Sequence, residues 1–175
     1  MKSHASLPVI VSQTEITAAV KRLAAAITKD YGDKNPLLIG VLKGSFVFLA
    51  DLMRQLDFPL EVDFIRLSSY GSETQTSGKV KVLQELKLAV KNRHVLVIED
   101  IIDTGVTIAF LLDYLKKKNP ASLKLCALTD KPARHRVTVK IDYKGITVPD
   151  KFLVGYGLDC DEKYRNLPEI RALED

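Results

Sequence analysis

The pattern of apolar and polar positions predicts three helices. The segment Ser12-Gln13-Thr14-Glu15 has the form of a capping box, a common start of a helix. Apolar residues then recur at the spacing of one buried helix face, at Ile16, Ala19, Val20, Leu23 and Ile27. Two further helices are predicted from Phe46 to about Leu56 and from about Val106 to Lys118, where Asn119-Pro120 ends the periodicity.

Short apolar runs between these helices predict β-strands. Val95–Ile98 is almost wholly apolar and β-branched, which is typical of a strand buried on both faces of a parallel sheet. The other predicted strands are Leu37–Leu42, Leu60 to about Ser68, about Lys79 to Leu83, Leu123–Leu128, Val137–Val139, Ile146–Val148 and Phe152–Tyr156. Strands and helices alternate through the middle of the chain, so the predicted fold class is α/β, a parallel sheet flanked by helices. The segments at about 60–85 and 135–160 are expected to add antiparallel edge strands or a small cap.

Composition narrows the class of protein. The 175 residues suit one domain, 1–175, and 46% hydrophobic with 27% charged residues is typical of a soluble globular protein. We expect a cytoplasmic protein with no membrane partner, because no apolar run approaches the ~18 residues of a membrane span and no secretory signal is evident. Cys126 and Cys160 have neither disulfide-framework nor zinc-site spacing. A net charge of +4 is too weak and dispersed to predict nucleic-acid binding.

The strongest chemical signal follows the strand Val95–Ile98. Glu99 and Asp100 come next, then two isoleucines and Asp103. Burying unpaired charge is costly, so the acidic pair must face a cation, hydroxyls or donors, in the crevice where open α/β sheets bind ligands. The turn Thr104–Thr107 offers hydroxyls and free N–H groups at a helix N-terminus, which suits a phosphate. This order predicts a sugar phosphate that is held at both ends.

Four other positions each allow two interpretations. Lys43-Gly44-Ser45, between a strand and a helix, is either an ordinary helix cap or a second anion site. Lys131 is a solvated loop lysine or a ligand contact. Phe152 is a core aromatic, or its ring stacks on a planar ligand close to the backbone of Leu153. The segment Asp159–Glu162 is a solvated acidic turn or supplies an oxygen ligand to magnesium.

Several other functions are disfavoured. The motifs G-x-G-x-x-G and G-x-x-x-x-G-K-[ST] are absent from the sequence, which argues against a dinucleotide dehydrogenase and a P-loop kinase. The three histidines form no catalytic pattern. A phosphoryl-accepting receiver domain would carry its acidic pair near the N-terminus, whereas here the pair lies past the midpoint and a phosphate loop follows it.

The chain resembles the purine, or type I, phosphoribosyltransferases, the bacterial hypoxanthine–guanine enzymes in particular. The resemblance runs from about Val9 to Ile170, and its motifs occur in family order: Leu42-Lys43-Gly44, Val62–Arg66 with Ser69-Tyr70-Gly71, Val95–Thr107, Thr129–Pro132, Phe152–Asp159 and Tyr164-Arg165. It implies the type I phosphoribosyltransferase fold with a small β-rich hood at about 150–170 and a flexible lid at about 69–78. The chain ends soon after Arg165, so a further C-terminal strand is expected to be missing or replaced.

The resemblance also implies an activity. The 5-phosphoribosyl group would pass from phosphoribosyl pyrophosphate to N9 of a 6-oxopurine, hypoxanthine or guanine with xanthine as a third candidate, giving IMP or GMP and pyrophosphate in purine salvage. Mg2+ is the implied cofactor, and a homodimer or homotetramer is the implied assembly. The rival interpretation is a protein of the same fold that binds nucleotide or RNA as a regulator without catalysis, against which the retained Asp103, Lys131, Phe152 and Asp159 argue.

Each site residue is assigned through this resemblance. Asp103 is the implied catalytic base or acid, near N7 of the purine. The implied phosphoribosyl and metal ligands are Glu99 and Asp100, with the 5-phosphate held by Thr104, Gly105, Val106 and Thr107. The implied pyrophosphate ligands are Lys43, Gly44 and Arg165, with a cis Leu42–Lys43 peptide bond. The implied purine contacts are Lys131, Phe152, Leu153 and Asp159, where Asp159 also binds a second magnesium, and the lid carries Ser69 and Tyr70.

Overall fold

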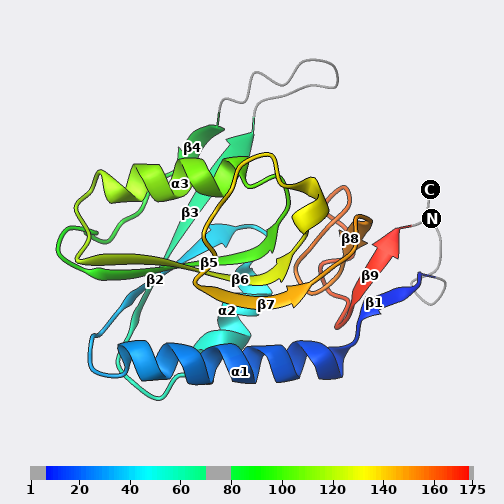
Figure 1. Ribbon diagram of the computed structural model, residues 1–175, viewed down its shortest axis with the longest axis horizontal. Coiled ribbons are helices and arrows are strands. Elements are labelled where there is room, and N and C mark those ends of the chain that lie inside the picture. Colours follow the sequence, from blue (N-terminus) through cyan, green and yellow to red (C-terminus); the bar gives the residue numbers. More distant parts are fainter. Residues whose placement is uncertain (1–6, 70–79, 174–175) are drawn as a thin grey trace.

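A six-stranded sheet forms the centre of the molecule, in the order β4-β3-β2-β5-β6-β7 (Figure 1). The computed structural model describes residues 7–69 and 80–173. The strands are β2 (Leu37–Leu42), β3 (Glu61–Ser69), β4 (Val80–Gln84), β5 (His94–Ile102), β6 (Ser122–Asp130) and β7 (Tyr143–Thr147). All neighbours pair in parallel except β4, which pairs antiparallel with β3 at one edge. The predicted α/β class with a largely parallel sheet is therefore confirmed.

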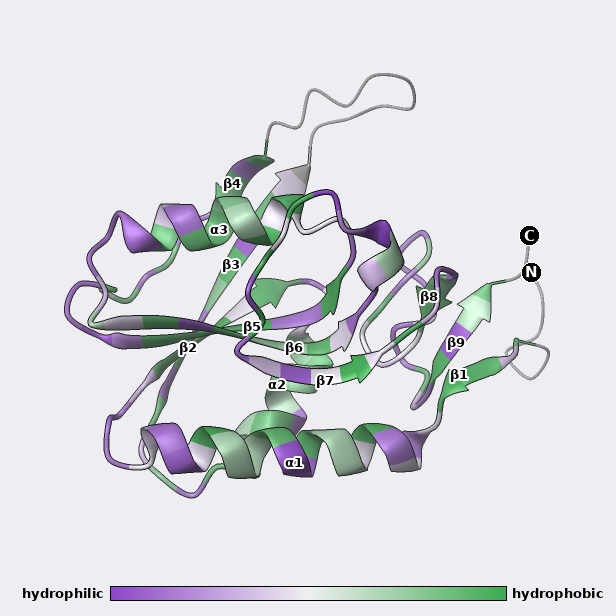
Figure 2. Ribbon diagram, in the orientation of Figure 1, coloured by the Kyte–Doolittle hydropathy of each residue, from purple (hydrophilic) through white to green (hydrophobic). Residues whose placement is uncertain are grey.

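Helices cover both faces of this sheet (Figure 1). Helices α1 (Gln13–Tyr31) and α2 (Phe46–Met53) lie on one face, and α3 (Val106–Lys116) lies on the other. Successive strand residues point to opposite faces, so Leu96 joins the core under α1 and α2, whereas Val95 joins the core under α3. Figure 2 shows the resulting mostly hydrophobic central strands between helices with mixed surfaces.

The ends of the three helices follow local chemistry. The predicted capping box is present, since the Ser12 N–H donates to Glu15 Oε2 at 2.8 Å and the Ser12 hydroxyl accepts from the Glu15 N–H. Helix α2 ends at Met53, three residues before the predicted end, and α3 ends at Lys116. In the part of the chain that the structure describes, no helix combines the length and the apolar character that crossing a membrane would need.

A second, three-stranded antiparallel sheet lies beside the first, in the order β1-β9-β8 (Figure 1). It consists of β1 (Val9–Val11), β8 (Phe152–Val154) and β9 (Ile170–Leu173). Of the two expectations for a further C-terminal strand, that it is missing is wrong, because β9 follows Arg165 and lies between β1 and β8. That the strand is a replacement stays a prediction. Three- and four-residue strands carry too little periodicity to be recognised in sequence, and their pairing partners are distant in the chain.

The segment after β6 also differs from expectation. Val137–Val139 is not a strand, and the next strand is β7 (Tyr143–Thr147) rather than Ile146–Val148. The backbone N–H of Val137 donates to the carbonyl of Thr104 at 3.2 Å, so this segment packs on the turn after β5 instead of joining a sheet. A tertiary contact here overrides the local β-propensity of the valines.

One buried hydroxyl links α2 to the segment after β8. The Tyr156 hydroxyl donates to Asp51 Oδ2 at 2.7 Å, and burial, together with this bond to a carboxylate, raises the pKa of Tyr156. Asp51 is also paired with Arg54, the C-cap residue of the same helix. The link connects the helix that follows Lys43-Gly44 to the segment that carries Asp159, so it fixes two loops relative to each other.

We expect Tyr156→Phe to lower the free energy of unfolding by about 1–2 kcal/mol, because it leaves Asp51 without this donor. Urea unfolding followed by circular dichroism measures the change. Tyr114→Phe is the matched control, since the Tyr114 hydroxyl is buried with no partner among the described residues, and its removal should be nearly neutral. Equal losses of unfolding free energy in both variants would contradict a stabilising role of the hydrogen bond between Tyr156 and Asp51.

Candidate active site

The acidic pair Glu99 and Asp100 lies within β5 rather than after it. The sequence pattern ended this strand at Ile98, but pairing with β6 extends it to Ile102. Asp100 is 7% exposed. Burial, and then repulsion by Asp100, raises the pKa of Glu99 well above its usual range, and burial also raises the pKa of Asp100. Two carboxylates in these surroundings favour the binding of a cation or of hydrogen-bond donors.

The donor set of this pair fits magnesium. Glu99 Oε2 is buried and has no hydrogen-bond partner within residues 7–69 and 80–173. Over the same residues, no group of three or more His, Cys, Asp or Glu side chains could enclose a metal ion. Magnesium is commonly held by one or two carboxylates, with water and substrate phosphates as its other ligands. The pair would therefore hold a hydrated ion that is shared with a phosphorylated substrate.

The segment Thr104–Thr107 forms the turn between β5 and α3. Gly105 has a left-handed φ of 79°, and a Cβ there would lie 2.6 Å from the carbonyl oxygen of Val137, so both the conformation and the space require glycine. A cavity of about 150 Å³ adjoins the turn, and its lining includes Glu99, Asp103 and Thr107. Hydroxyls and the first N–H groups of a helix around such a cavity suit a phosphate.

Gly44 brings the loop after β2 against the acidic pair. A Cβ on Gly44 would lie 1.8 Å from Oδ2 of Asp100, so a larger residue would displace that carboxylate. The adjoining Leu42–Lys43 peptide bond is cis, as the resemblance implied. The loop after β2 and the end of β5 therefore form one continuous surface of backbone, ammonium and carboxylate groups.

Two further contacts hold this loop. Ser45 is the N-cap residue of α2, as the cap interpretation predicts, but its hydroxyl donates to the carbonyl of Val41 at 2.8 Å and makes no side-chain cap bond to the helix. The anion-site interpretation of Lys43-Gly44-Ser45 stays a prediction. On the other side, a Cβ on Gly157 would lie 2.1 Å from the carbonyl oxygen of Gly44. Backbone from the segment after β8 thus packs directly on the loop.

Asp103 lies between two cationic side chains. Its Oδ1 accepts from Nε of Arg134 at 3.3 Å and is 3.9 Å from Nζ of Lys131. Arg134 Nε is also 3.8 Å from Oδ1 of Asp150. Arg134, at the end of the 3-10 helix Pro132–Arg134, was missed in sequence; its only signal was an arginine three residues after Lys131. Both cations fix the orientation of the Asp103 carboxylate.

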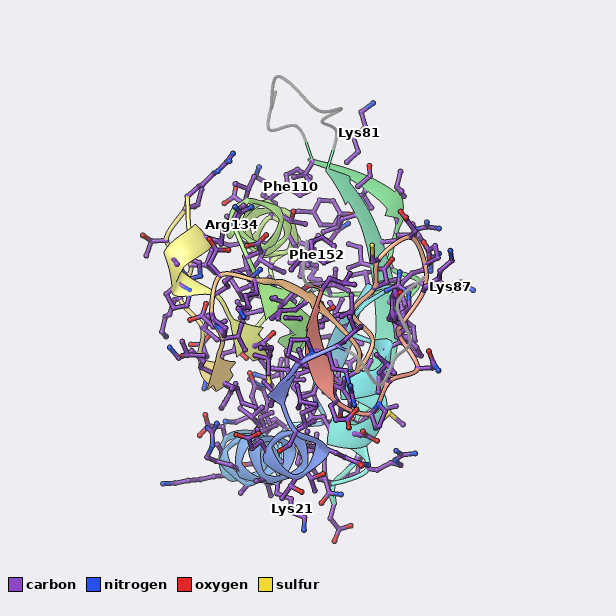
Figure 3. The ribbon with its side chains drawn as sticks, turned by 90° about the vertical axis from the view of Figure 1, so that its right-hand side faces the viewer. Lys21, Lys81, Lys87, Phe110, Arg134 and Phe152 are labelled. Carbon is purple, nitrogen blue, oxygen red and sulfur yellow. The ribbon has the colours of Figure 1, made fainter. Side chains whose placement is uncertain are left out.

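The structure excludes one of the two interpretations of Lys131 and one of the two of Phe152, and their roles as ligand contacts stay predictions. Lys131 is 7% exposed and donates to the carbonyl of Lys151 at 2.8 Å, so it is not a solvated loop lysine. Phe152 is 56% exposed, so it is not a core aromatic, whereas the next side chain, Leu153, is buried. Phe152 and Arg134, labelled in Figure 3, both lie nearer to α3 than to α1 in that view. An exposed ring near a buried ammonium suits a planar polar ligand.

Arg165 and Asp159 form an ion pair. Arg165 Nη2 is 2.9 Å from Asp159 Oδ1, and its Nη1 donates to the carbonyl of Gly157 at 2.8 Å. The other oxygen of Asp159 accepts the N–H of Glu162 at 2.9 Å. The carboxylate of Glu162, which the sequence indicated only as part of the acidic turn Asp159–Glu162, contacts both Arg165 and Lys43. Both oxygens of Asp159 therefore have protein partners, and its role as a metal ligand stays a prediction.

The expected lid falls largely outside the described residues. Ser69 is the last residue of β3 and pairs with Val80 of β4, while Tyr70 and the rest of 70–79 lie outside the described part. The lid role of Ser69 and Tyr70 therefore stays a prediction.

A larger pocket, of about 660 Å³, lies between α1, α2 and the segment after β8. Its lining includes Ile16, Phe46, Tyr156 and Leu167. Arg165 reaches its wall, but the acidic pair and the phosphate turn do not. The ionisable groups converge instead where the loops after β2, β5 and β6 meet, and this region is the candidate active site.

This geometry can bind an anion at each of two loops, with carboxylates between them. A family model described as the phosphoribosyl transferase domain matches residues 10–161. The chain therefore belongs to the phosphoribosyl transferase family.

Relatives within this family share a more specific name. The chain is 48% identical over 167 residues to the hypoxanthine-guanine phosphoribosyltransferase of Streptococcus pneumoniae (strain ATCC BAA-255 / R6), with 95% of this chain and 93% of the relative covered. It is 45% identical to that of Bacillus subtilis (strain 168), covering 99% and 97%. The crystal structure of a hypoxanthine-guanine phosphoribosyltransferase from Bacillus anthracis matches with a TM-score of 0.90 at 45% identity, covering 95% and 98%.

Gly44→Ala should reduce kcat/KM for phosphoribosyl pyrophosphate at least about tenfold, because the new methyl group displaces Asp100 from its place beside the loop. Steady-state kinetics, with thermal unfolding as a fold check, measures this. Gly32→Ala is the control, at the C-terminal cap of α1 with a φ of −55°. Unchanged kinetics in Gly44→Ala would show that the contact with Asp100 has no catalytic importance.

We expect Glu99→Gln to raise the stability of the protein and to lower its activity. Burial and the neighbouring Asp100 disfavour the ionised form of Glu99, so a neutral amide should stabilise the metal-free protein by about 1 kcal/mol, or about 2–4 °C in Tm, while catalytic efficiency falls at least about tenfold. Differential scanning calorimetry in a chelator, together with kinetics, tests both effects. Glu85→Gln, at an exposed position, should change neither. A lower Tm in Glu99→Gln would refute the assumed repulsion.

Proposed function

We propose that this protein transfers the 5-phosphoribosyl group of phosphoribosyl pyrophosphate to N9 of hypoxanthine or guanine, with release of pyrophosphate. The products are IMP and GMP, so the reaction salvages free purine bases. The observation that carries the proposal is the meeting of Asp103, the acidic pair and Lys43-Gly44 at one end of the parallel sheet. The names of the relatives support the choice of substrates.

Each group in the site has a task in this reaction. Breaking the bond between the anomeric carbon and the pyrophosphate oxygen develops positive charge on the ribose and negative charge on the leaving group. Lys43, Arg165 and the backbone of Gly44 stabilise the leaving group, and Thr104–Thr107 hold the 5-phosphate. When bound at Glu99 and Asp100, magnesium supplies further stabilisation of the pyrophosphate charge.

The purine is positioned on the other side of the ribose. Phe152 stacks on the ring, Lys131 contacts O6 and the backbone of Leu153 reads the purine edge. N9 attacks the anomeric carbon, and Asp103 takes the proton that the purine loses or returns it in the reverse direction, near N7. Arg134 and Lys131 hold the Asp103 carboxylate in place for this transfer.

The finer assignments belong to the same proposal. Magnesium is the cofactor, with Asp159 as the ligand of a second ion once Arg165 has turned to pyrophosphate. Residues 69–78, with Ser69 and Tyr70, form a lid that excludes water from the reacting ribose. Xanthine is a further candidate base, the assembly is a homodimer or homotetramer, and the protein acts in the cytoplasm as one domain.

The test is an ultraviolet assay of the purified protein with phosphoribosyl pyrophosphate, magnesium and one base at a time. Hypoxanthine and guanine should react, and adenine should not. The rate with xanthine, compared with the rates for the other two 6-oxopurines, gives the order of substrate preference. Tight nucleotide binding without turnover of any base would support the rival, a regulator of the same fold.

Asp103→Asn should lower kcat by about 10²-fold or more, because the amide cannot accept the purine proton. Binding of phosphoribosyl pyrophosphate, measured by calorimetry, should change far less. Asp113→Asn on the outer surface of α3 makes the same chemical change away from the site and should be neutral. A kcat within twofold of the unmodified protein in Asp103→Asn would remove Asp103 from the mechanism.

A further inference from the structure

Glu162 bridges the two cations that the proposed function assigns to pyrophosphate. Its Oε1 is 2.9 Å from Lys43 Nζ, and its Oε2 is 3.0 Å from Arg165 Nη2. Lys43 lies 119 positions away in the chain, so the contact joins the loop after β2 to the turn after β8. One carboxylate thus neutralises an ammonium and a guanidinium that come from different parts of the fold.

The backbone around Glu162 is unusual for the residues that it carries. Cys160 and Lys163 exchange backbone hydrogen bonds at 3.2 and 3.0 Å, and the two residues between them, Asp161 and Glu162, have φ of 51° and 63°. Positive φ at both central residues is what a type I′ turn requires, and glycine is favoured at the second central position. A glutamate in this conformation is disfavoured locally, and such an outlier indicates a function for the side chain.

A carboxylate and a pyrophosphate offer the same chemistry to these cations. Both present several anionic oxygens to Lys and Arg donors, and such charge-assisted bonds are the strong ones for either partner. Pyrophosphate carries more charge and would displace the carboxylate. Because the pair with Glu162 is partly exposed to solvent, it is weak enough to open.

We propose that Glu162 is an internal competitor of pyrophosphate, which occupies Lys43 and Arg165 between turnovers and is displaced when phosphoribosyl pyrophosphate binds. This inference rests on the proposed function, since it takes Lys43 and Arg165 as the pyrophosphate ligands. It makes Glu162 a positioning residue that keeps both cations in the site. When the Glu162 carboxylate returns to Lys43 and Arg165, it helps to displace the product pyrophosphate.

The expected effect follows from the competition. A ligand that binds only the state in which Glu162 has moved away has an apparent Kd raised by the reciprocal of that state's population. Removing the carboxylate should therefore tighten the binding of pyrophosphate and of phosphoribosyl pyrophosphate by about two- to tenfold. KM for phosphoribosyl pyrophosphate should fall, and kcat should fall with it because product leaves more slowly.

The experiment is calorimetric titration of magnesium pyrophosphate into the unmodified protein and four variants, with steady-state kinetics of each. Glu162→Gln keeps the shape of the side chain, and Glu162→Gly removes it while suiting the turn. Asp161→Asn changes the net charge equally, one residue away in the same turn, and controls for long-range electrostatics. Lys43→Ala tests the pyrophosphate site itself.

Tighter binding in both Glu162 variants, with Asp161→Asn unchanged, is the expected result. Weaker or unchanged binding in the Glu162 variants, while Lys43→Ala weakens it, would overturn the competition but leave the proposed function intact. If Asp161→Asn tightened pyrophosphate binding equally, the change in net charge would explain the tightening, and this result would also overturn the competition. Unchanged binding in Lys43→Ala would instead show that the pyrophosphate site is wrongly placed.

Discussion

The parallel pairing of β2, β5 and β6 is the constraint on which the rest of the structure depends. Parallel neighbours end at the same edge of a sheet, so the loops that follow these strands meet there whatever their distance in sequence. Both faces of the strands are covered by helices, which leaves this edge as the place where polar side chains can collect. Lys43-Gly44, the turn Thr104–Thr107 and Lys131 all follow these three strands.

The acidic pair at this edge of the sheet lowers the stability of the fold. Glu99 and Asp100 lie side by side in a buried strand, where burial raises the pKa of both carboxyls. A sheet selected for stability alone would carry apolar residues at these positions. The close approach of Gly44 to Asp100 adds to the cost, since a glycine loses more conformational entropy on folding than other residues. Destabilising groups that converge in this way are typical of a site that binds a charged ligand.

The second sheet connects this edge to both ends of the described chain. β9 lies between β1 and β8, so residues near 10 and near 171 support the strand that carries Phe152 and Leu153. The turns after β8 then place Gly157 on the loop after β2 and Glu162 between Lys43 and Arg165. The loop after β2 and the turns after β8 are therefore in direct contact.

The sequence by itself determined the fold class, the long helices, the central strands and the family, because their periodicity and their motifs are local. It also identified Glu99, Asp100 and Asp103 as candidate functional residues, since charged side chains next to a buried strand have no packing role. Only the tertiary structure decided that β5 continues through the acidic pair, that Val137–Val139 packs on the phosphate turn, and that β1 and β9 pair. The contacts of Arg134 with Asp103 and of Glu162 with Lys43 were equally beyond sequence reasoning. Each depends on groups that are distant in the chain, and their meeting is set by the packing of the sheet and its loops rather than by any local pattern.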